Sequence, residues 1–173
     1  MSTPTGLVLP VPGREQPAWL ETCDPRDPSA TLATLAANTA YLSLIRPSAP
    51  IRIVSLVVEI GGNFGNIDLG IFTSTDDATF TLLASTGPTT SVGTNSLQTI
   101  ALTSAVTLPP GTSYWFAVSA DNAIVTILRL GANANHVVAI AAGSRSVAKA
   151  ATFPLATFSS PSTTAVTPWI RGV

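Results

Sequence analysis

Charged side chains are scarce in this sequence. Asp, Glu, Lys and Arg make up 10 % of its 173 residues, whereas a soluble domain usually carries about 25 %. Hydrophobic residues make up 46 %, so the surface must consist largely of Ser, Thr, Asn and Ala. Such a surface lacks the like-charge repulsion that keeps free proteins apart. The composition therefore favours a chain that works inside an assembly.

Basic clusters and long apolar runs are also missing. The eight basic residues are scattered and the net charge is −1, which excludes the electrostatic footprint that nucleic acid or anionic lipid requires. The most apolar stretch, 123–142, is interrupted by residues such as Arg129, Asn133 and His136. It is too polar for a membrane-spanning segment of about 18 residues. We expect neither nucleic-acid binding nor membrane insertion.

Cysteine and histidine occur once each, as Cys23 and His136. A single cysteine cannot form an internal disulfide, and a single histidine without a cysteine pair builds no zinc site unless distant carboxylates complete it. We therefore expect no metal and no other cofactor. The first cation is Arg14, so the preceding residues lack the basic region of a secretory signal. This predicts synthesis and assembly in a cytoplasm.

Proline, by contrast, is concentrated near the amino terminus. Residues 1–28 hold six of the fourteen prolines, and because proline fixes φ and removes a donor, they predict an extended arm. Leu7, Leu9, Val11 and Trp19 are too apolar for a solvated tail, so we expect them to be assembly contacts. The predicted division is an arm and linker over 1–38 and a β domain over 39–173.

The segment 27–37 has the one plausible helical pattern in the chain. Leu32, Leu35 and Ala36 recur at helical spacing, and Ser29 could cap the first turn. The threonines here are weak helix formers, so a loop with apolar anchors is the alternative.

From Thr39 onward the sequence has the pattern of short β-strands. Apolar segments at 51–60, 66–72 and 80–84 are each ended by Gly, Asn or Asp. These residues favour turns, so the stretch predicts a meander of antiparallel strands.

Alternation within the strands predicts which side chains face the core. Asn66, Asp68 and Gly70 are expected on a solvent-exposed face, opposite to the core residues of the same strand. The expected core residues are Ile67, Leu69, Ile71, Tyr114, Phe116 and Val118.

Further strands complete an all-β pattern. They are predicted at 40–45, 97–102, 113–120, 123–130, 136–141 and 165–171, with Asp121-Asn122 as a hairpin turn and 143–164 without a clear pattern. Turn signals every 8–12 residues or so predict a two-sheet antiparallel β-sandwich, jelly-roll-like, with an extended Pro-rich arm. An immunoglobulin-type topology is the alternative, but the paired cysteines that would favour it are missing.

Acidic residues offer weak candidate sites. Glu59 and Asp68 could face each other as the carboxylate pair of a glycosidase, but the simpler interpretation places both on a solvent-exposed sheet face. Asp76-Asp77 lacks the ligand spacing of a calcium loop and suits a turn. We expect no enzyme activity.

Trp115 is the aromatic candidate. It lies on the face of its strand opposite to Tyr114 and Phe116. We expect it to contact a neighbouring subunit or a glycan, since aromatic faces stack on sugar rings, and core packing is the simpler interpretation.

Three motifs lie between residues 61 and 118. They read GGNFGNIDLGIF (61–72), LASTG (83–87) and VTLPPGTSYWFAV (106–118). With these motifs the region from Asn38 to Ser119 resembles the jelly-roll modules found in virion proteins of tailed bacteriophages. Such modules occur in minor tail proteins, fibres and capsid decoration proteins.

The resemblance implies a non-enzymatic structural or interaction protein of a phage virion. A minor tail protein is favoured, with a capsid decoration protein as the alternative and a carbohydrate-binding module for host-surface adhesion as the second alternative. The expected partners are other virion proteins and further copies of the chain, as a homotrimer or a ring. The number three comes from the resemblance, whereas the need for some partner follows from the low charge and the sheet edges.

Overall fold

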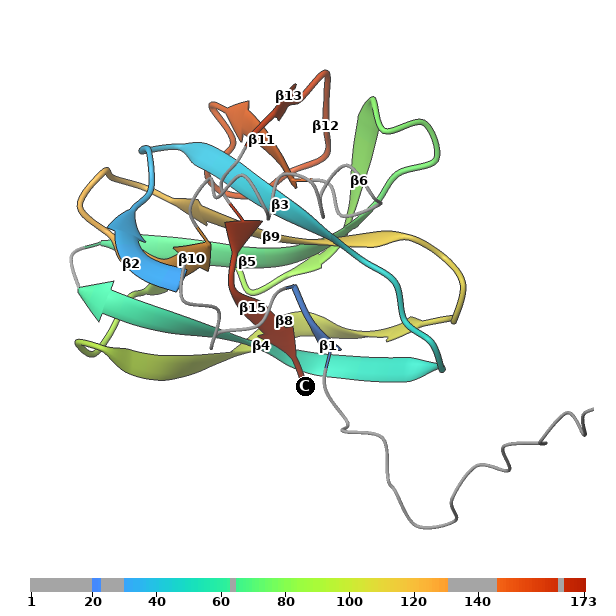
Figure 1. Cartoon of the computed structure of the whole chain (residues 1–173), viewed down its shortest axis with the longest axis horizontal. Coiled ribbons are helices and arrows are strands. Elements are labelled where there is room, and N and C mark those ends of the chain that lie inside the picture. The colour runs from blue at the N-terminus through green and yellow to red at the C-terminus, as the bar shows by residue number, and fades with distance from the viewer. Residues whose placement is uncertain (1–19, 23–29, 63–64, 131–145, 165–166) are drawn as a thin grey trace, which may run out of the picture.

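Every regular element in the described part of the chain is a β-strand (Figure 1). The computed structural model describes residues 20–22, 30–62, 65–130, 146–164 and 167–173. The strands are β1 (Leu20–Glu21), β2 (Ala30–Thr34), β3 (Thr39–Ile45), β4 (Ile51–Gly62), β5 (Asn66–Thr73), β6 (Thr79–Ser85), β7 (Thr89–Thr90), β8 (Ser96–Leu108), β9 (Tyr114–Ala120), β10 (Thr126–Leu130), β11 (Ser146–Ala150), β12 (Phe158–Ser159), β13 (Ser162–Thr163), β14 (Thr167–Pro168) and β15 (Ile170–Gly172).

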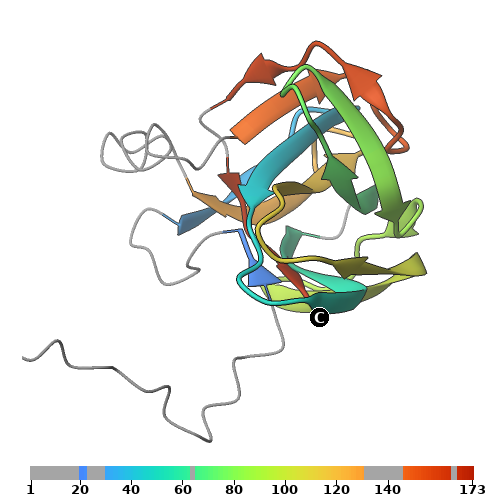
Figure 2. The same cartoon turned by 90° about the vertical axis from the view of Figure 1, so that its right-hand side faces the viewer.

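The strands form two antiparallel sheets packed face to face (Figure 2). Sheet A has the order β1-β15-β4-β10-β14, with β8 on β4 and β2 on β10. Sheet B has the order β12-β6-β5-β9-β3-β11-β13, with β7 on β5. Consecutive strands lie in different sheets after β2, β3, β4, β7, β8, β9, β10 and β13. This is a jelly-roll-like β-sandwich, as predicted, while residues 1–19 and 23–28 of the predicted arm lie outside the described residues.

Sheet A is organised around β4. Its 12 residues pair with β8 along one edge, and with β15 and β10 along the other. Ile53, Leu56 and Val58 are completely buried on its inner face. Because both edges of β4 are occupied, no edge is left for β5. The predicted meander is therefore wrong at its first step, whereas the antiparallel pairing of β5 with β6 agrees with it.

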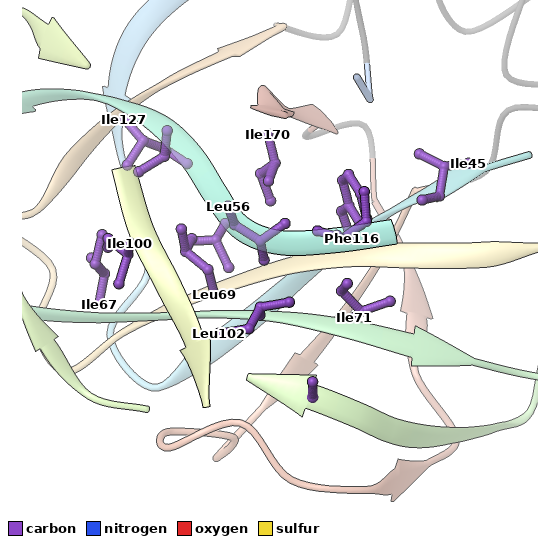
Figure 3. Close-up of a cluster of buried hydrophobic side chains, with 14 of the residues drawn as sticks. Ile45, Leu56, Ile67, Leu69, Ile71, Ile100, Leu102, Phe116, Ile127 and Ile170 are labelled. Carbon is purple, nitrogen blue, oxygen red and sulfur yellow. The ribbon is translucent and has the colours of Figure 1, made fainter. Parts of the chain in front are cut away.

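The main core lies between the two sheets (Figure 3). Side chains from β4, β8, β10 and β15 of sheet A meet those from β3, β5 and β9 of sheet B. Each fully buried aliphatic or aromatic side chain contributes about 1.5–3 kcal/mol through removal of apolar surface from water. All the residues predicted to face the core are buried: Ile67, Leu69, Ile71, Tyr114, Phe116 and Val118.

A second core covers the outer face of sheet B. The stretch 146–163 supplies β11 and β13 beside β3, and also β12 beside β6, so both ends of the sheet come from one segment (Figure 2, orange). We call residues 146–163 the cover. The second core consists of Ala40, Leu42, Phe72, Phe80, Trp115, Ala117, Leu155 and Phe158.

The cover changes the environment of β5. Asp68 and Gly70 were predicted to face solvent, but both are buried because the cover lies over them. A Cβ added to Gly70 would lie 2.8 Å from Leu155 Cδ1, which shows how closely the cover approaches the strand. The prediction of a solvent-exposed face on this strand is wrong.

Other local predictions also need correction. The helix predicted from the pattern at 27–37 is wrong, because Ala30–Thr34 form the strand β2, which pairs with β10. The contact continues beyond the strand, where Leu35 N–H donates to Val125 O at 3.1 Å. Leu35 is buried, so residues 30–38 belong to the sandwich rather than to a linker. Asp121-Asn122 is not a hairpin turn, because β9 lies in sheet B and β10 in sheet A. The strand predicted at 136–141 lies outside the described residues.

Candidate interaction surface

One end of the sandwich gathers exposed apolar side chains. We define the loop end as the group of segments Gly65-Asn66, 90–97 and 121–124. It carries Val92, Leu97 and Ile124, whose side chains are 54 %, 57 % and 59 % exposed. Single exposed apolar residues are ordinary, but three of them at one end make this end a candidate contact surface.

Hydrogen bonds tie the segments of the loop end to one another. Asn66 donates from its backbone N to Asp121 Oδ1 at 3.0 Å and from its side-chain amide to Asp121 Oδ2 at 2.8 Å. Ser91 N–H donates to Gly65 O at 2.9 Å, and Val92 N–H donates to Gln98 Oε1 at 3.0 Å. The exposed apolar residues therefore belong to segments that are hydrogen-bonded to one another, with Leu97 at the start of β8.

The second feature is the outer edge of β8. This strand is 13 residues long and contains no charged residue, glycine or proline. In the described part of the chain it pairs with β4 alone. Natural proteins usually protect such edges with charge or proline, so an unprotected edge is a template for another strand. The sequence predicted a strand over 97–102 only, and the signal that was missed is the unbroken run up to Pro109.

The third feature is the base of the amino-terminal arm. Leu20 and Glu21 form β1, which pairs with β15 at one border of sheet A. Thr22 N–H donates to Ile170 O at 3.0 Å, and Ile170 N–H donates to Thr22 Oγ1 at 2.9 Å. Glu21 Oε1 lies 3.7 Å from Arg171 Nη1. The residues that precede Leu20 are thus attached to a fixed point on the sheet.

The Arg171 side chain also covers an aromatic ring. Its guanidinium carbon lies 5.6 Å from the centroid of the Trp169 ring, a cation–π distance. Trp169 is 3 % exposed and packs with Val57 and Leu128 on the outer face of sheet A. The base of the arm therefore lies beside a packed apolar cluster.

Asp68 is the buried acidic residue of sheet B. Its Oδ2 accepts Leu155 N–H at 2.9 Å, and its Oδ1 accepts the Thr86 hydroxyl at 3.2 Å. Burial raises the pKa of this carboxyl above its usual value, and the hydrogen bond from Leu155 is the largest opposing effect. The arrangement attaches the cover to β5, so it is structural in character.

The structure places Glu59 and Asp68 on different sheets and Asp76 in a turn. Glu59 is on β4 in sheet A and Asp68 is on β5 in sheet B, so the interpretation that both lie on one solvent-exposed sheet face is wrong. Asp76 accepts Ala78 N–H and Thr79 N–H at 2.9 and 2.8 Å, as its expected role in a turn requires. Among the described residues no group of His, Cys, Asp and Glu could hold a metal ion.

The structure corrects the prediction for Trp115. Its side chain is 0 % exposed and packs edge-on against Phe80 at 5.1 Å between ring centroids. Because the cover lies over it, Trp115 contacts neither solvent nor a glycan, and the simpler interpretation of core packing is the one that fits. The arm contacts Leu7, Leu9, Val11 and Trp19 lie outside the described residues, as do Cys23 and His136.

The comparisons with protein families and with curated proteins add no relative to this picture. No protein-family model and no curated protein matches the sequence. Within the ranges that the structure describes, no helix is long and apolar enough to cross a membrane.

Proposed function

We propose that this chain is a non-enzymatic structural protein of a tailed-phage virion, of the minor tail class. In this proposal it is assembled in the host cytoplasm, docks through its amino-terminal arm and presents the sandwich at the particle surface. Its partners are other virion proteins and further copies of itself.

The observation that carries the proposal is the base of the arm. Leu20 and Glu21 are held in sheet A by β15, so the preceding apolar segment extends from a rigid body rather than from a linker. Apolar residues on such a segment suit contact with a partner, and prolines lower the entropy that docking costs. The jelly-roll-like sandwich is also the fold that the resemblance of residues 38–119 implies.

The uncharged edge of β8 and the loop end support the same role. In a protein that functions inside an assembly, partners can cover an unprotected strand edge and the exposed side chains of Val92, Leu97 and Ile124. No described feature favours the carbohydrate-binding alternative, since Trp115 and Trp169 are both buried.

The test is incorporation into particles. A full-length variant with Leu7, Leu9, Val11 and Trp19 all changed to Ser should fold with an unchanged melting temperature but be absent from purified virions. A matched control changes Thr31, Thr75 and Thr81, which are exposed and lie away from the β8 edge, to Ser and should be incorporated normally. Incorporation of the arm variant at the native copy number would refute the role of the arm, and absence of the native chain from particles would refute the virion proposal. Particles with the chain on the head instead of the tail would favour the capsid decoration alternative.

A further inference from the structure

The open edge of β8 presents a defined set of backbone groups. Ser55 and Val173 exchange both of their backbone hydrogen bonds, each 3.0 Å long, so Ser55 directs its N–H and C=O toward the β15 side of β4. Since these directions alternate along a strand, Leu56 and Val58 direct theirs toward β8.

The register of the β4 and β8 pair then fixes the other side of β8. Leu56 lies opposite Ile100 and Val58 lies opposite Gln98, so Gln98 and Ile100 bond to β4. The intervening residues direct their N–H and C=O away from the sheet: Leu97, Thr99 and Ala101. All of these outward-directed residues are exposed.

The open stretch has a clear limit. At Thr103 the hydroxyl donates to Ser85 O at 2.8 Å, where β8 meets the end of β6. The acceptor edge is therefore residues 96–101, which is long enough for one short added strand. It contains no charged side chain that would repel such a strand.

The arm sequence has a matching asymmetry. Pro4, Pro10 and Pro12 all occupy even positions. If residues 5–11 are extended, the even positions direct their backbone toward one edge and the odd positions toward the other. Within residues 5–11 the one position without an N–H is Pro10, which lies on the even edge with Gly6 and Val8. Every odd position carries a donor: Thr5, Leu7, Leu9 and Val11. Such a segment can pair on one side and end the sheet on the other.

We propose that residues 5–11 of one copy add as a strand to the β8 edge, residues 96–101, of a second copy. This rests on the proposed role of the arm as the assembly contact, and it names the surface that receives the arm. The odd-numbered donors face Leu97, Thr99 and Ala101, and the proline edge faces outward.

The order of sheet A suits pairing of the arm with a second copy. In the path β1-β15-β4-β8 the arm begins at one border and its acceptor lies at the other. Copies placed border to border bring the arm of one beside β8 of the next, and residues 12–19 can span up to about 28 Å. This head-to-tail contact closes into a ring if the rotation between copies allows it.

The first test compares neighbouring proline substitutions in the full chain. Leu9→Pro removes a donor from the pairing edge, whereas Val8→Pro removes one from the edge that already carries prolines. We expect Leu9→Pro to weaken self-association about tenfold or more in sedimentation velocity, and Val8→Pro to leave it unchanged. Equal losses in both variants would overturn the proposal.

The second test addresses the acceptor and the exchange between copies. Thr99→Pro removes an outward N–H and spares the bonds to β4, while Thr99→Val keeps the N–H and is the control. Thr99→Pro should abolish self-association with the melting temperature retained, and Thr99→Val should not. At a concentration where the Leu9→Pro and Thr99→Pro chains are each monomeric alone, their mixture should form a one-to-one dimer, because the first supplies an intact edge and the second an intact arm.

Other results would contradict this contact in identifiable ways. A monomeric native chain at high concentration overturns it, as does a mixture that stays monomeric. Loss of association in Thr99→Pro with full association in Leu9→Pro would show that β8 pairs with another β8 instead. Since all these measurements use purified protein, they fail or succeed independently of whether the chain is found in virions.

Discussion

The Asp68 side chain is a single residue that joins distant parts of sheet B. It lies on β5 and accepts hydrogen bonds from Thr86, after β6, and from Leu155 in the cover. Burying a carboxylate is costly unless such donors are present. The same side chain therefore fixes the cover in place and makes folding depend on pH.

Acidification should stabilise the chain through Asp68. Burial raises its pKa above 3.8, so the folded state binds a proton more tightly than the unfolded state does. The contribution of this group to the unfolding free energy thus grows as the pH falls through the folded-state pKa and levels off below 3.8. The measured quantity is the unfolding free energy of the native chain minus that of Asp68→Asn, obtained by chemical denaturation. We expect this difference to increase from about pH 7 to about pH 4.

Asp76 provides a control of opposite sign. Hydrogen bonds from Thr79 N–H and Ala78 N–H lower the pKa of its carboxyl. Its contribution is present above 3.8 and is lost as the pH falls through the lowered pKa. The unfolding free energy of the native chain minus that of Asp76→Asn should therefore decrease as the pH falls. A difference for Asp68→Asn that shrinks as well would contradict the assigned burial.

At the residue scale, the alternation in the sequence predicted one face of β5 correctly and the other face wrongly. Ile67, Leu69 and Ile71 face the main core as expected. The burial of Asp68 could not be derived, because the cover that buries it comes from Leu155, 87 positions along the chain. Polar residues at alternate positions of a strand normally indicate a solvent-exposed face. In this chain that face is buried by a distant segment whose own sequence has no clear pattern.

At the scale of elements, the cover is the least regular part of the sandwich and yet completes its second core. Phe158 lies at 5.3 Å and 12° from Phe80, and at 5.4 Å and 54° from Phe72. Stacked and tilted aromatic pairs contribute beyond the area that they bury. The short strand β12 is therefore held by its aromatic side chain as much as by its pairing with β6.

Phe158→Ala should loosen the cover and expose Trp115. Loss of a buried phenylalanine costs about 3 kcal/mol or more, and its removal opens a path to the indole ring that is 0 % exposed in the native chain. Thermal unfolding and acrylamide quenching of tryptophan fluorescence measure the two effects. The neighbouring exposed position supplies a control, since Ala156→Ser should change neither. Unchanged quenching in Phe158→Ala would show that the cover does not protect Trp115.

Element types were predictable where the pattern was long, and less so where it was short. The strands β3, β5 and β9 have strong alternation or apolar runs and lie close to their predicted ranges. At 30–34 the spacing of Leu32 and Leu35 suited a helix, but the open side of β10 and the β-branched Thr31 and Thr34 favour a strand. A partner that is far away in sequence decided the outcome.

For the whole molecule, the candidate contacts are distributed over opposite borders of one sheet. Their composition was visible in the sequence as low charge and as an apolar, Pro-rich arm. Their location was not, because the order β1-β15-β4-β8 depends on which strands meet across the sandwich. The sequence therefore predicts the need for a partner, and the sheet order shows where the two proposed contacts lie relative to each other.

The far-UV circular dichroism of the intact chain should be dominated by β structure. We expect a helix content under about 10 %, well below the usual share of about one third. The reason is that the regular elements of the described ranges are all strands. A spectrum with a third of the residues in helices would contradict the all-β architecture.

The position of β15 has a consequence for how the chain reaches its folded state. Ile170 bonds to Thr22 across 148 positions, and β15 fills the edge of β4 that local segments leave open. Contacts between residues this distant in sequence form only after a large loop has closed, and closing the loop costs conformational entropy. Folding is therefore slow, in the range of milliseconds to seconds. Until then the central strand of sheet A has an exposed apolar border. Aggregation during synthesis, rather than instability of the finished sandwich, is therefore the hazard that this topology creates.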